Sequence, residues 1–185
     1  MADGRGDGDA ASDMALVARW QAGDERAATE LVARHAPALA RFVAGGGGPE
    51  DVDEVVQDAF VRAFGAIGSF RGESSFRTWL FSIARRIMLD RRRAARRDRA
   101  HVPLGESDAA TDFGPLDGLI ASETRGRLEV ALQNLTRTQR DVFALRVGEG
   151  LSYKEIAEVL GTTEGAARVH YHNAMRALQE QVDDE

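Results

Sequence analysis

Apolar residues recur at intervals of three and four along most of this chain, and no segment alternates convincingly between apolar and polar residues. An α-helix turns once every ~3.6 residues, so this spacing gathers apolar side chains on one face, whereas a half-buried strand needs a period of two. Glycines and capping residues separate the periodic segments, as they do at helix ends. The pattern therefore predicts an all-α protein.

The first periodic region spans residues 12–99 and follows a Gly- and Asp-rich start, residues 1–11, which we expect to be disordered. We expect helices to begin at Ser12 and again after Asp24, which has the position of an N-cap. The glycine run at residues 45–48 should end the second of these helices. Together these helices predict one small helical domain.

The segment FRGESSF, residues 70–76, interrupts the periodicity and predicts a loop, with Ser74 or Ser75 capping the helix that follows. That helix runs into a cluster of eight arginines and two acids between Arg85 and Arg99, in a chain whose net charge is −6. Arginines concentrated in this way indicate contact with DNA phosphates, although a helix spreads them around its axis. A solvated charged face and a patch for anionic lipid are the alternatives.

Residues 100–121 contain acids and prolines but no Lys or Arg, and they predict an acidic flexible linker between two helical domains. Residues 122–182 then return to helical periodicity. Ser152 and Glu155 match a capping box, and the short helix that they open stops at Gly161 before a longer helix starts.

A short capped helix, a turn and a longer helix form the helix-turn-helix plan, whose second helix enters the major groove of DNA. An ordinary helical hairpin would use the same apolar residues as core, so it is the alternative. The candidate DNA-reading residues on the second helix are Thr163, Glu164, Arg168, His172 and Arg176.

Several classes of function find no support. The chain has no cysteine, which removes disulfides, thiolate metal sites and thiol catalysis. It has no Gly-rich phosphate loop and no convergent His/Asp/Ser signature, so we expect neither an enzyme nor a cofactor. His170 and His172 point to nearly opposite sides of a helix, which argues against a metal site. No apolar run approaches ~20 residues and no signal peptide is apparent, so a cytoplasmic protein without membrane insertion is expected.

Three segments resemble one family in order and spacing: DVDEVVQDAFVRAF (residues 51–64), FRGESSFRTWLFSIARRIMLD (70–90) and GLSYKEIAEVLG (150–161). They are similar to the sigma factors of the extracytoplasmic-function group, within the sigma-70 family of bacterial RNA polymerase. The resemblance implies a region 2-like bundle and a region 4-like helix-turn-helix domain. It also implies binding to core polymerase, recognition of the −10 and −35 promoter elements, and DNA melting.

The resemblance implies a role for each of three residue sets. Residues implied to dock on the polymerase, chiefly on the β′ clamp helices with further contact to the β subunit, are Asp53, Glu54, Val56, Gln57, Phe60 and Arg62. Residues implied to bind the −10 element are Phe70, Arg71, Phe76, Trp79, Arg85, Arg86, Arg91, Arg92 and Arg93. The −35 reader is implied to use the five residues named above for the second helix of the helix-turn-helix. An anti-sigma protein is a further implied partner.

Two positions depart from the usual pattern of the family. Arg86 stands where an Asn is usual, and Asn173 stands where an Arg is usual. The promoter sequence therefore cannot be carried over from the family, and the inducing signal is not written in the chain. A stand-alone helix-turn-helix regulator is the alternative function, although it leaves FRGESSFRTWL and the acidic linker without a role.

Overall fold

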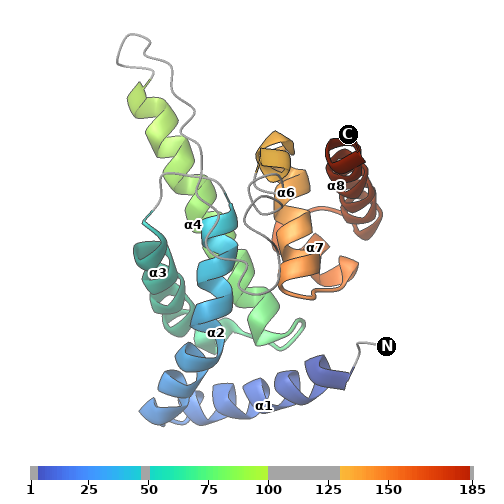
Figure 1. Ribbon diagram of the computed structural model, residues 1–185. Helices are drawn as coiled ribbons and strands as arrows, with labels where there is room; N and C mark the ends of the chain where they lie inside the picture. The colour runs from blue at the N-terminus through green and yellow to red at the C-terminus, as the bar shows by residue number, and fades with distance from the viewer. Residues whose placement is uncertain (1–3, 47–50, 100–129, 184–185) are drawn as a thin grey trace.

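The computed structural model describes residues 4–46, 51–99 and 130–183, and within these ranges helices joined by short loops make up the chain, with no strand (Figure 1). The prediction of an all-α fold is confirmed. The predicted acidic linker, residues 100–121, lies outside the described residues. The helices form an N-terminal module, residues 4–99, and a C-terminal module, residues 130–183.

The N-terminal module is a bundle of long helices in which α2, α3 and α4 pack together and α1 crosses their base (Figure 1). A short 3-10 turn, η1, precedes the loop that leads into α4. The elements are α1 (Gly4–Gln21), α2 (Glu25–Gly45), α3 (Val52–Gly65), η1 (Ile67–Ser69) and α4 (Phe76–Arg99).

The helix starts of this module follow the predicted capping logic. The side chain of Asp24 accepts a hydrogen bond from the backbone N–H of Arg26, and Ser75 Oγ accepts one from Thr78 N–H, each at 3.0 Å. Both predicted caps are confirmed. At α3 the cap is Asp51, whose side chain accepts from the backbone N–H of Glu54 at 3.2 Å.

The expectation of disorder over residues 1–11 is wrong for residues 4–11, which form the first turns of α1. The helix therefore does not begin at Ser12. Extending a helix that already exists costs far less than nucleating one. The second half of α1 is anchored by Leu16 and Val17, both buried, so the Gly- and Asp-rich turns continue a helix that is already in place.

A buried carboxylate ties α1 to α2. Asp13 is 1% exposed, and Arg34 Nη1 donates to its Oδ1 at 2.7 Å. His35 Nε2 lies 2.8 Å from Asp13 Oδ2. Burial of a carboxylate is tolerated when a cation pairs with it, and here the guanidinium of Arg34 does so from α2.

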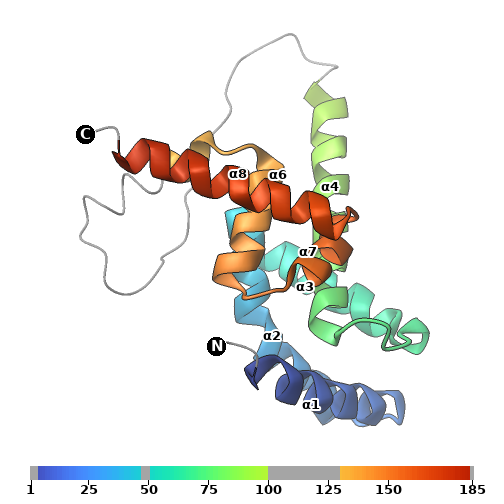
Figure 2. The ribbon, with the colours of Figure 1, turned by 90° about the vertical axis from the view of Figure 1, so that its right-hand side faces the viewer.

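The C-terminal module begins with helical residues 130–134 and continues through three helices and one π turn. The outermost helix, α8, crosses α6 and α7 on the side that faces away from the N-terminal module (Figures 1 and 2). The elements are α6 (Arg137–Phe143), the π turn η2 (Ala144–Gly148), α7 (Tyr153–Leu160) and α8 (Glu164–Asp183).

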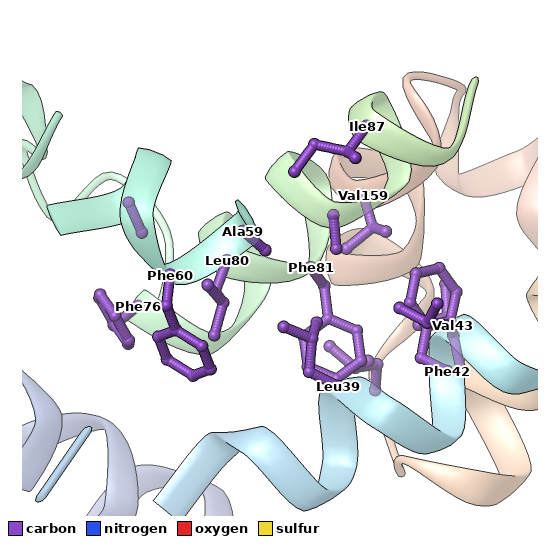
Figure 3. Close-up of a cluster of buried hydrophobic side chains, with 14 of the residues drawn as sticks. Leu39, Phe42, Val43, Ala59, Phe60, Phe76, Leu80, Phe81, Ile87 and Val159 are labelled. Carbon is purple, nitrogen blue, oxygen red and sulfur yellow. The ribbon is translucent and has the colours of Figure 1, made fainter. Parts of the chain in front are cut away.

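The two modules share one buried apolar cluster. The helix α7 packs along α4, and α6 and η2 contact α2. In Figure 3, Val159 of α7 lies near Phe81 and Ile87 of α4, facing Phe42 and Val43 of α2. Sequence periodicity predicted two bundles but gave no sign of this contact, because periodicity marks a buried face without naming its partner.

Candidate nucleic-acid interface

The arginine-rich half of α4 projects beyond the ends of α2 and α3 (Figure 1). The side chains of Arg93 and Arg96 on this half of the helix are exposed, as is that of Arg86 nearer the core, and Arg93 keeps 73% of its side-chain surface. The positive charge of these exposed guanidinium groups, held on a rigid helix, complements the negative charge of the phosphate backbone of DNA. The exposure of Arg86 and Arg93 leaves them accessible to phosphates, and their assignment to DNA stays a prediction.

Two other arginines of the cluster are held by the protein itself. Arg91 donates from Nη1 to Glu54 Oε2 at 2.8 Å and from Nη2 to Asp58 Oδ2 at 2.7 Å. The bond to Glu54 is the main reason that the pKa of the Arg91 guanidinium is raised above its usual value. Arg92 donates from Nη2 to the carbonyl oxygen of Gly46 at 2.7 Å. In this structure the two side chains clamp α4 to its own module, which corrects their assignment to the exposed DNA surface.

Arg85 also differs from the prediction. Its side chain is 19% exposed, and its Nε lies 3.9 Å from Oδ2 of Asp141 in α6. The side chain therefore lies between the two modules. A phosphate group could reach it only if the C-terminal module moved away.

The aromatic residues around the FRGESSF loop form a packed cluster. Phe76 is fully buried, with its ring centroid 6.0 Å from that of Trp79 and 6.1 Å from that of Phe70. The Phe70 and Trp79 rings are half-buried and lie 4.9 Å apart. The predicted contact of Phe76 with DNA is therefore wrong for this conformation, since a ring without exposed surface cannot stack on a base. Phe76 supports the loop instead.

Beside this loop lies an open cleft of about 400 Å³. The cleft is lined by Met14 of α1, by the loop from Gly72 to Ser75, and by residues of α7. The α7 residues are Glu155, Glu158 and Lys154. Arg71, at the start of the loop, is exposed. The surface implied to capture an unpaired base therefore faces acidic side chains from the other module.

The face of α3 implied to dock on polymerase carries only some of the residues that were expected there. Exposed polar residues on it include Asp53, Glu54, Gln57 and Arg62. Phe60, expected on the surface with them, is 5% exposed and packs with its ring 5.8 Å from that of Phe64. This expectation is wrong because Phe60 belongs to the apolar stripe of the helix.

Two neighbouring side chains complete the α3 surface. Val56 is half-buried, and Val61 is 64% exposed, so Val61 supplies the apolar group that Phe60 was expected to offer. Sequence reasoning missed Val61 because it is one residue out of phase with the buried stripe. A mixed polar and apolar patch of this kind suits a contact with another protein.

The predicted helix-turn-helix is present, formed by α7, a short turn and α8. Ser152 and Glu155 form a complete capping box at the start of α7. Gly161 ends α7 in the left-handed conformation, with φ of 61°, and its N–H bonds back to α7 carbonyls. Thr163 Oγ1 then accepts from the backbone N–H of Ala166 at 3.1 Å and opens α8. The turn is therefore fixed at both ends.

Four of the five predicted reading residues lie exposed along one side of α8 at intervals of four, from Glu164 to Arg176, and Thr163 is exposed just before the helix. Arg168 Nη2 donates to Glu164 Oε1 at 2.9 Å, and its guanidinium lies 5.2 Å from the centre of the Tyr153 ring. Arg176 and Glu180 are farther apart, at 3.9 Å. Val169 was missed by sequence reasoning and is 57% exposed beside Arg168, where an apolar side chain could meet a thymine methyl group.

Within the described ranges, no helix is both long and apolar enough to cross a bilayer. The same ranges hold no group of three or more His, Cys, Asp or Glu residues arranged to bind a metal ion.

Comparison with known protein families gives two matches in chain order. The family model described as "Sigma-70 region 2" matches residues 31–98, and the one described as "Sigma-70, region 4" matches residues 125–178. The first falls within the N-terminal module, and the second covers most of the C-terminal module.

Curated relatives and solved structures agree with these matches. The chain is 32% identical to the ECF RNA polymerase sigma-E factor of Haemophilus influenzae, over 92% of this chain and 95% of that protein. It is 31% identical to the corresponding factor of Escherichia coli K12, over 92% and 94%. Among solved structures, CnrH in complex with the cytosolic domain of CnrY gives a TM-score of 0.67 at 34% identity, covering 94% of this chain and 99% of CnrH. The sigma factor RpoE of Bartonella quintana, solved with the anti-sigma factor NepR, has the same fold, with a TM-score of 0.73 at 22% identity over 85% and 97%.

Proposed function

Because this chain belongs to the extracytoplasmic-function group of the sigma-70 family, we propose that it binds core RNA polymerase and directs it to promoters by recognising their −10 and −35 elements. One observation carries the proposal. The region 2 and region 4 modules occur in the family order, and each presents exposed arginines on a helix, α4 in the first and α8 in the second.

The N-terminal module is proposed to bind and help open the −10 element. The exposed arginines of α4 would hold the duplex by its phosphates, and the loop beginning at Arg71 would receive an unpaired base. Separating a base from its neighbours costs a few kcal/mol, which phosphate contacts and stacking can offset. Exposed Trp79 surface is a candidate for that stacking.

The salt dependence of promoter binding should distinguish exposed arginines from clamped ones. In the double variant Arg86→Gln/Arg93→Gln, the slope of log affinity against log salt should fall by about 1.8, since each lost phosphate contact removes about 0.9. The measurement is binding of the sigma–polymerase complex to a promoter duplex at several salt concentrations. As matched control, Arg91→Gln should leave the slope nearly unchanged, because Glu54 and Asp58 hold that side chain. Equal slopes for the double variant and the wild type would contradict the phosphate role of Arg86 and Arg93.

The C-terminal module is proposed to read the −35 element with α8. The exposed side of that helix carries two arginines, one histidine and Val169, so it combines hydrogen-bond donors with an apolar contact. Arg168 is held in place by Glu164 and Tyr153 before DNA arrives, which lowers the entropy lost on binding.

Polymerase docking is proposed to use α3 through Asp53, Gln57 and the exposed apolar group of Val61. Reversing a charge there, Asp53→Lys, should weaken binding to core polymerase about tenfold, which corresponds to about 1.4 kcal/mol. The matched control is Glu180→Lys, an equally exposed acid on α8 with no proposed polymerase contact. Equal affinity of the two variants for core polymerase would remove the assignment of α3.

Transcription from a defined start tests the whole proposal. Purified chain added to core polymerase should produce transcripts that begin at specific sites on genomic DNA fragments, and omitting the chain should abolish them. A stand-alone regulator would bind DNA without polymerase and would give no such transcripts, so their absence would favour that alternative.

Further, more general proposals accompany this one. We propose that the protein acts in the cytoplasm, where bacterial polymerase works, and that it has no catalytic activity of its own. An anti-sigma partner is also proposed, and its support is that the similar chain CnrH was solved bound to the cytosolic domain of CnrY.

A further inference from the structure

Two positions one turn apart on α8 have no explanation inside the protein. Val169 is 57% exposed, so its apolar side chain gains little from burial, and its β-branch slightly disfavours a helix. Gly165 stands one turn earlier, where glycine weakens a helix relative to alanine. A Cβ at Gly165 would meet no heavy atom within 4 Å among the described residues, and its φ is not positive, so neither packing nor backbone conformation requires a glycine. Positions that break local rules without an internal reason are typical of functional sites.

Gly165 and Val169 share one side of α8 with Asn173, because residues four apart lie one above the other on a helix. This row lies in the N-terminal half of the outermost helix of the C-terminal module (Figure 2). In a helix-turn-helix, the N-terminal residues of the second helix reach the base edges. Because Gly165 has no side chain, the backbone of α8 can approach the floor of the groove closely, and Val169 is the first side chain of the row.

Arg168, the residue before Val169, is held toward α7 instead. Its Nη2 donates to Glu164 Oε1 at 2.9 Å, and its guanidinium lies 5.2 Å from the centre of the Tyr153 ring. The guanidinium of Arg146 lies 4.9 Å from the same ring centre, so two cations gather beside the start of α7. The first helix of a helix-turn-helix crosses the DNA backbone, where cations meet phosphates. Contact with base edges is therefore left to the row that contains Val169.

The methyl groups of Val169 can distinguish bases only by apolar contact. In the major groove the apolar group is the methyl on C5 of thymine, and the other distinguishing groups are hydrogen-bond donors and acceptors. Cytosine methylated at C5 places the same methyl group at this edge, whereas uracil and unmodified cytosine have only a hydrogen there. Because a valine in a helix strongly prefers one χ1 rotamer, its methyl groups are positioned before DNA arrives and lose little entropy on contact.

We propose that Val169 reads the C5 methyl group of a pyrimidine in the −35 element, so that the protein accepts thymine or 5-methylcytosine at one position and discriminates against uracil and unmodified cytosine. Gly165 is the positioning residue that lets α8 come close enough. The inference deepens the proposed function, because it rests on α8 entering the major groove. Its consequence is that methylation of a promoter cytosine becomes a chemical mark that this chain recognises.

Selection of DNA duplexes from a randomised pool locates the methyl contact. The full chain, alone and bound to core polymerase, should enrich thymine at one position, and Val169→Ser should lose that preference while the other selected positions persist. Serine and valine have similar helix propensities, so this variant leaves α8 intact. The matched control is Val147→Ser, which removes a valine of η2 that is 55% exposed and has no proposed DNA contact. An unchanged preference in Val169→Ser would overturn the inference.

Replacing single groups on the selected duplex then tests the chemistry. Uracil in place of the selected thymine should weaken binding about fourfold, the value of one methyl group removed from water. At the same position, 5-methylcytosine should bind more tightly than cytosine by a similar factor. Both factors should vanish in Val169→Ser and persist in Val169→Ile, which keeps the branched apolar surface. A uracil duplex bound as tightly as the thymine one, or a methylated cytosine that brings no gain, would overturn the inference.

A side chain at Gly165 tests the close approach of α8. Leucine is a stronger helix former and its Cβ would enter open space, so the unfolding midpoint of Gly165→Leu should not fall. Its affinity for the selected duplex should fall about tenfold, because the side chain holds α8 away from the base edges. Unchanged affinity would overturn the placement of this row in the groove. If core polymerase does not bind the chain, the proposed function fails, while the duplexes bound by the chain alone still decide the methyl contact.

Discussion

Replacing Phe76 with alanine is expected to lower the free energy of unfolding by about 3–5 kcal/mol, the largest effect of any single change considered for this protein. Phe76 has no exposed surface, and its ring lies against those of His35, Phe70 and Trp79, with centroids 5.6–6.1 Å apart. Truncation would leave a cavity where α4 begins, beneath the loop that precedes it. Urea unfolding followed by tryptophan fluorescence measures the loss.

The control for this prediction lies in the same loop. Arg71→Ala removes an exposed side chain and should change stability by less than about 0.5 kcal/mol, while it weakens binding to −10 DNA. If Phe76→Ala instead kept full stability and lost only DNA binding, the ring would have to leave the core to meet a base. The role implied by the family resemblance would then be correct, and the structural role assigned here would be wrong.

The second large effect concerns Asp141, which lies buried where α6 meets α4. Burial is the main cause that raises the pKa of this carboxyl from 3.8 to about 6, and nearby Arg85, Arg92 and Arg140 oppose the increase. Arg137 Nε also lies 3.8 Å from Asp141 Oδ2. Within the described part of the chain no hydrogen bond reaches Asp141 Oδ1, so the ionised form is poorly solvated. The variant Asp141→Asn should therefore stabilise the protein at pH 7 by up to about 3 kcal/mol.

The sign of this effect follows from proton binding. Between pH 3.8 and about 6, the folded protein holds the Asp141 proton more tightly than the unfolded chain does, so stability falls as pH rises through this window. Asp141→Asn should remove that fall, and unfolding midpoints measured from pH 4 to 8 would reveal it. Loss of stability at pH 7 in the variant would mean that attraction to the arginines outweighs burial.

Asp24 is a useful comparison because its pKa moves in the opposite direction. A hydrogen bond from Arg19 is the main cause that lowers the pKa of this exposed N-cap below 3.8. Ionised Asp24 therefore favours the fold above pH 3.8, and the contribution is lost as the pH falls through the lowered pKa. Asp24→Asn should therefore not stabilise the protein at pH 7. If only Asp141→Asn stabilises it, the gain comes from the burial of Asp141 and not from the loss of a carboxylate charge in general.

Local signals in the sequence were enough to predict the helices and their starts. The caps at Asp24, Ser75 and Ser152, and the glycine stop at Gly161, each act within a few residues of the chain. The helix-turn-helix and the exposed side of α8 follow from those signals and from helical period alone. For these features the sequence pattern and the structure agree because both reflect short-range physics.

Features that depend on distant partners could not be predicted in this way. Arg91 pairs with Glu54 from 37 residues away, and Arg41 with Glu149 from 108 residues away. Neither pairing leaves a mark in local composition, so Arg91 was assigned to DNA in the same way as the exposed Arg86 and Arg93. The wrong expectation for Phe60 and the missed exposure of Val61 have a related cause. Side chains at neighbouring positions on a helix point only ~100° apart around its axis.

The helix α4 is one uninterrupted rod whose first half is embedded in the core and whose last turns carry the exposed Arg93 and Arg96. Its 24 residues span about 36 Å, and the clamps at Arg91 and Arg92 hold about the first two thirds of that length to the module. The packing of this anchored part therefore sets the direction of the tip. Small changes in packing around Leu80 and Phe81 would change where the end of α4 meets a nucleic acid. Substitutions far from any phosphate could therefore change which promoters are recognised.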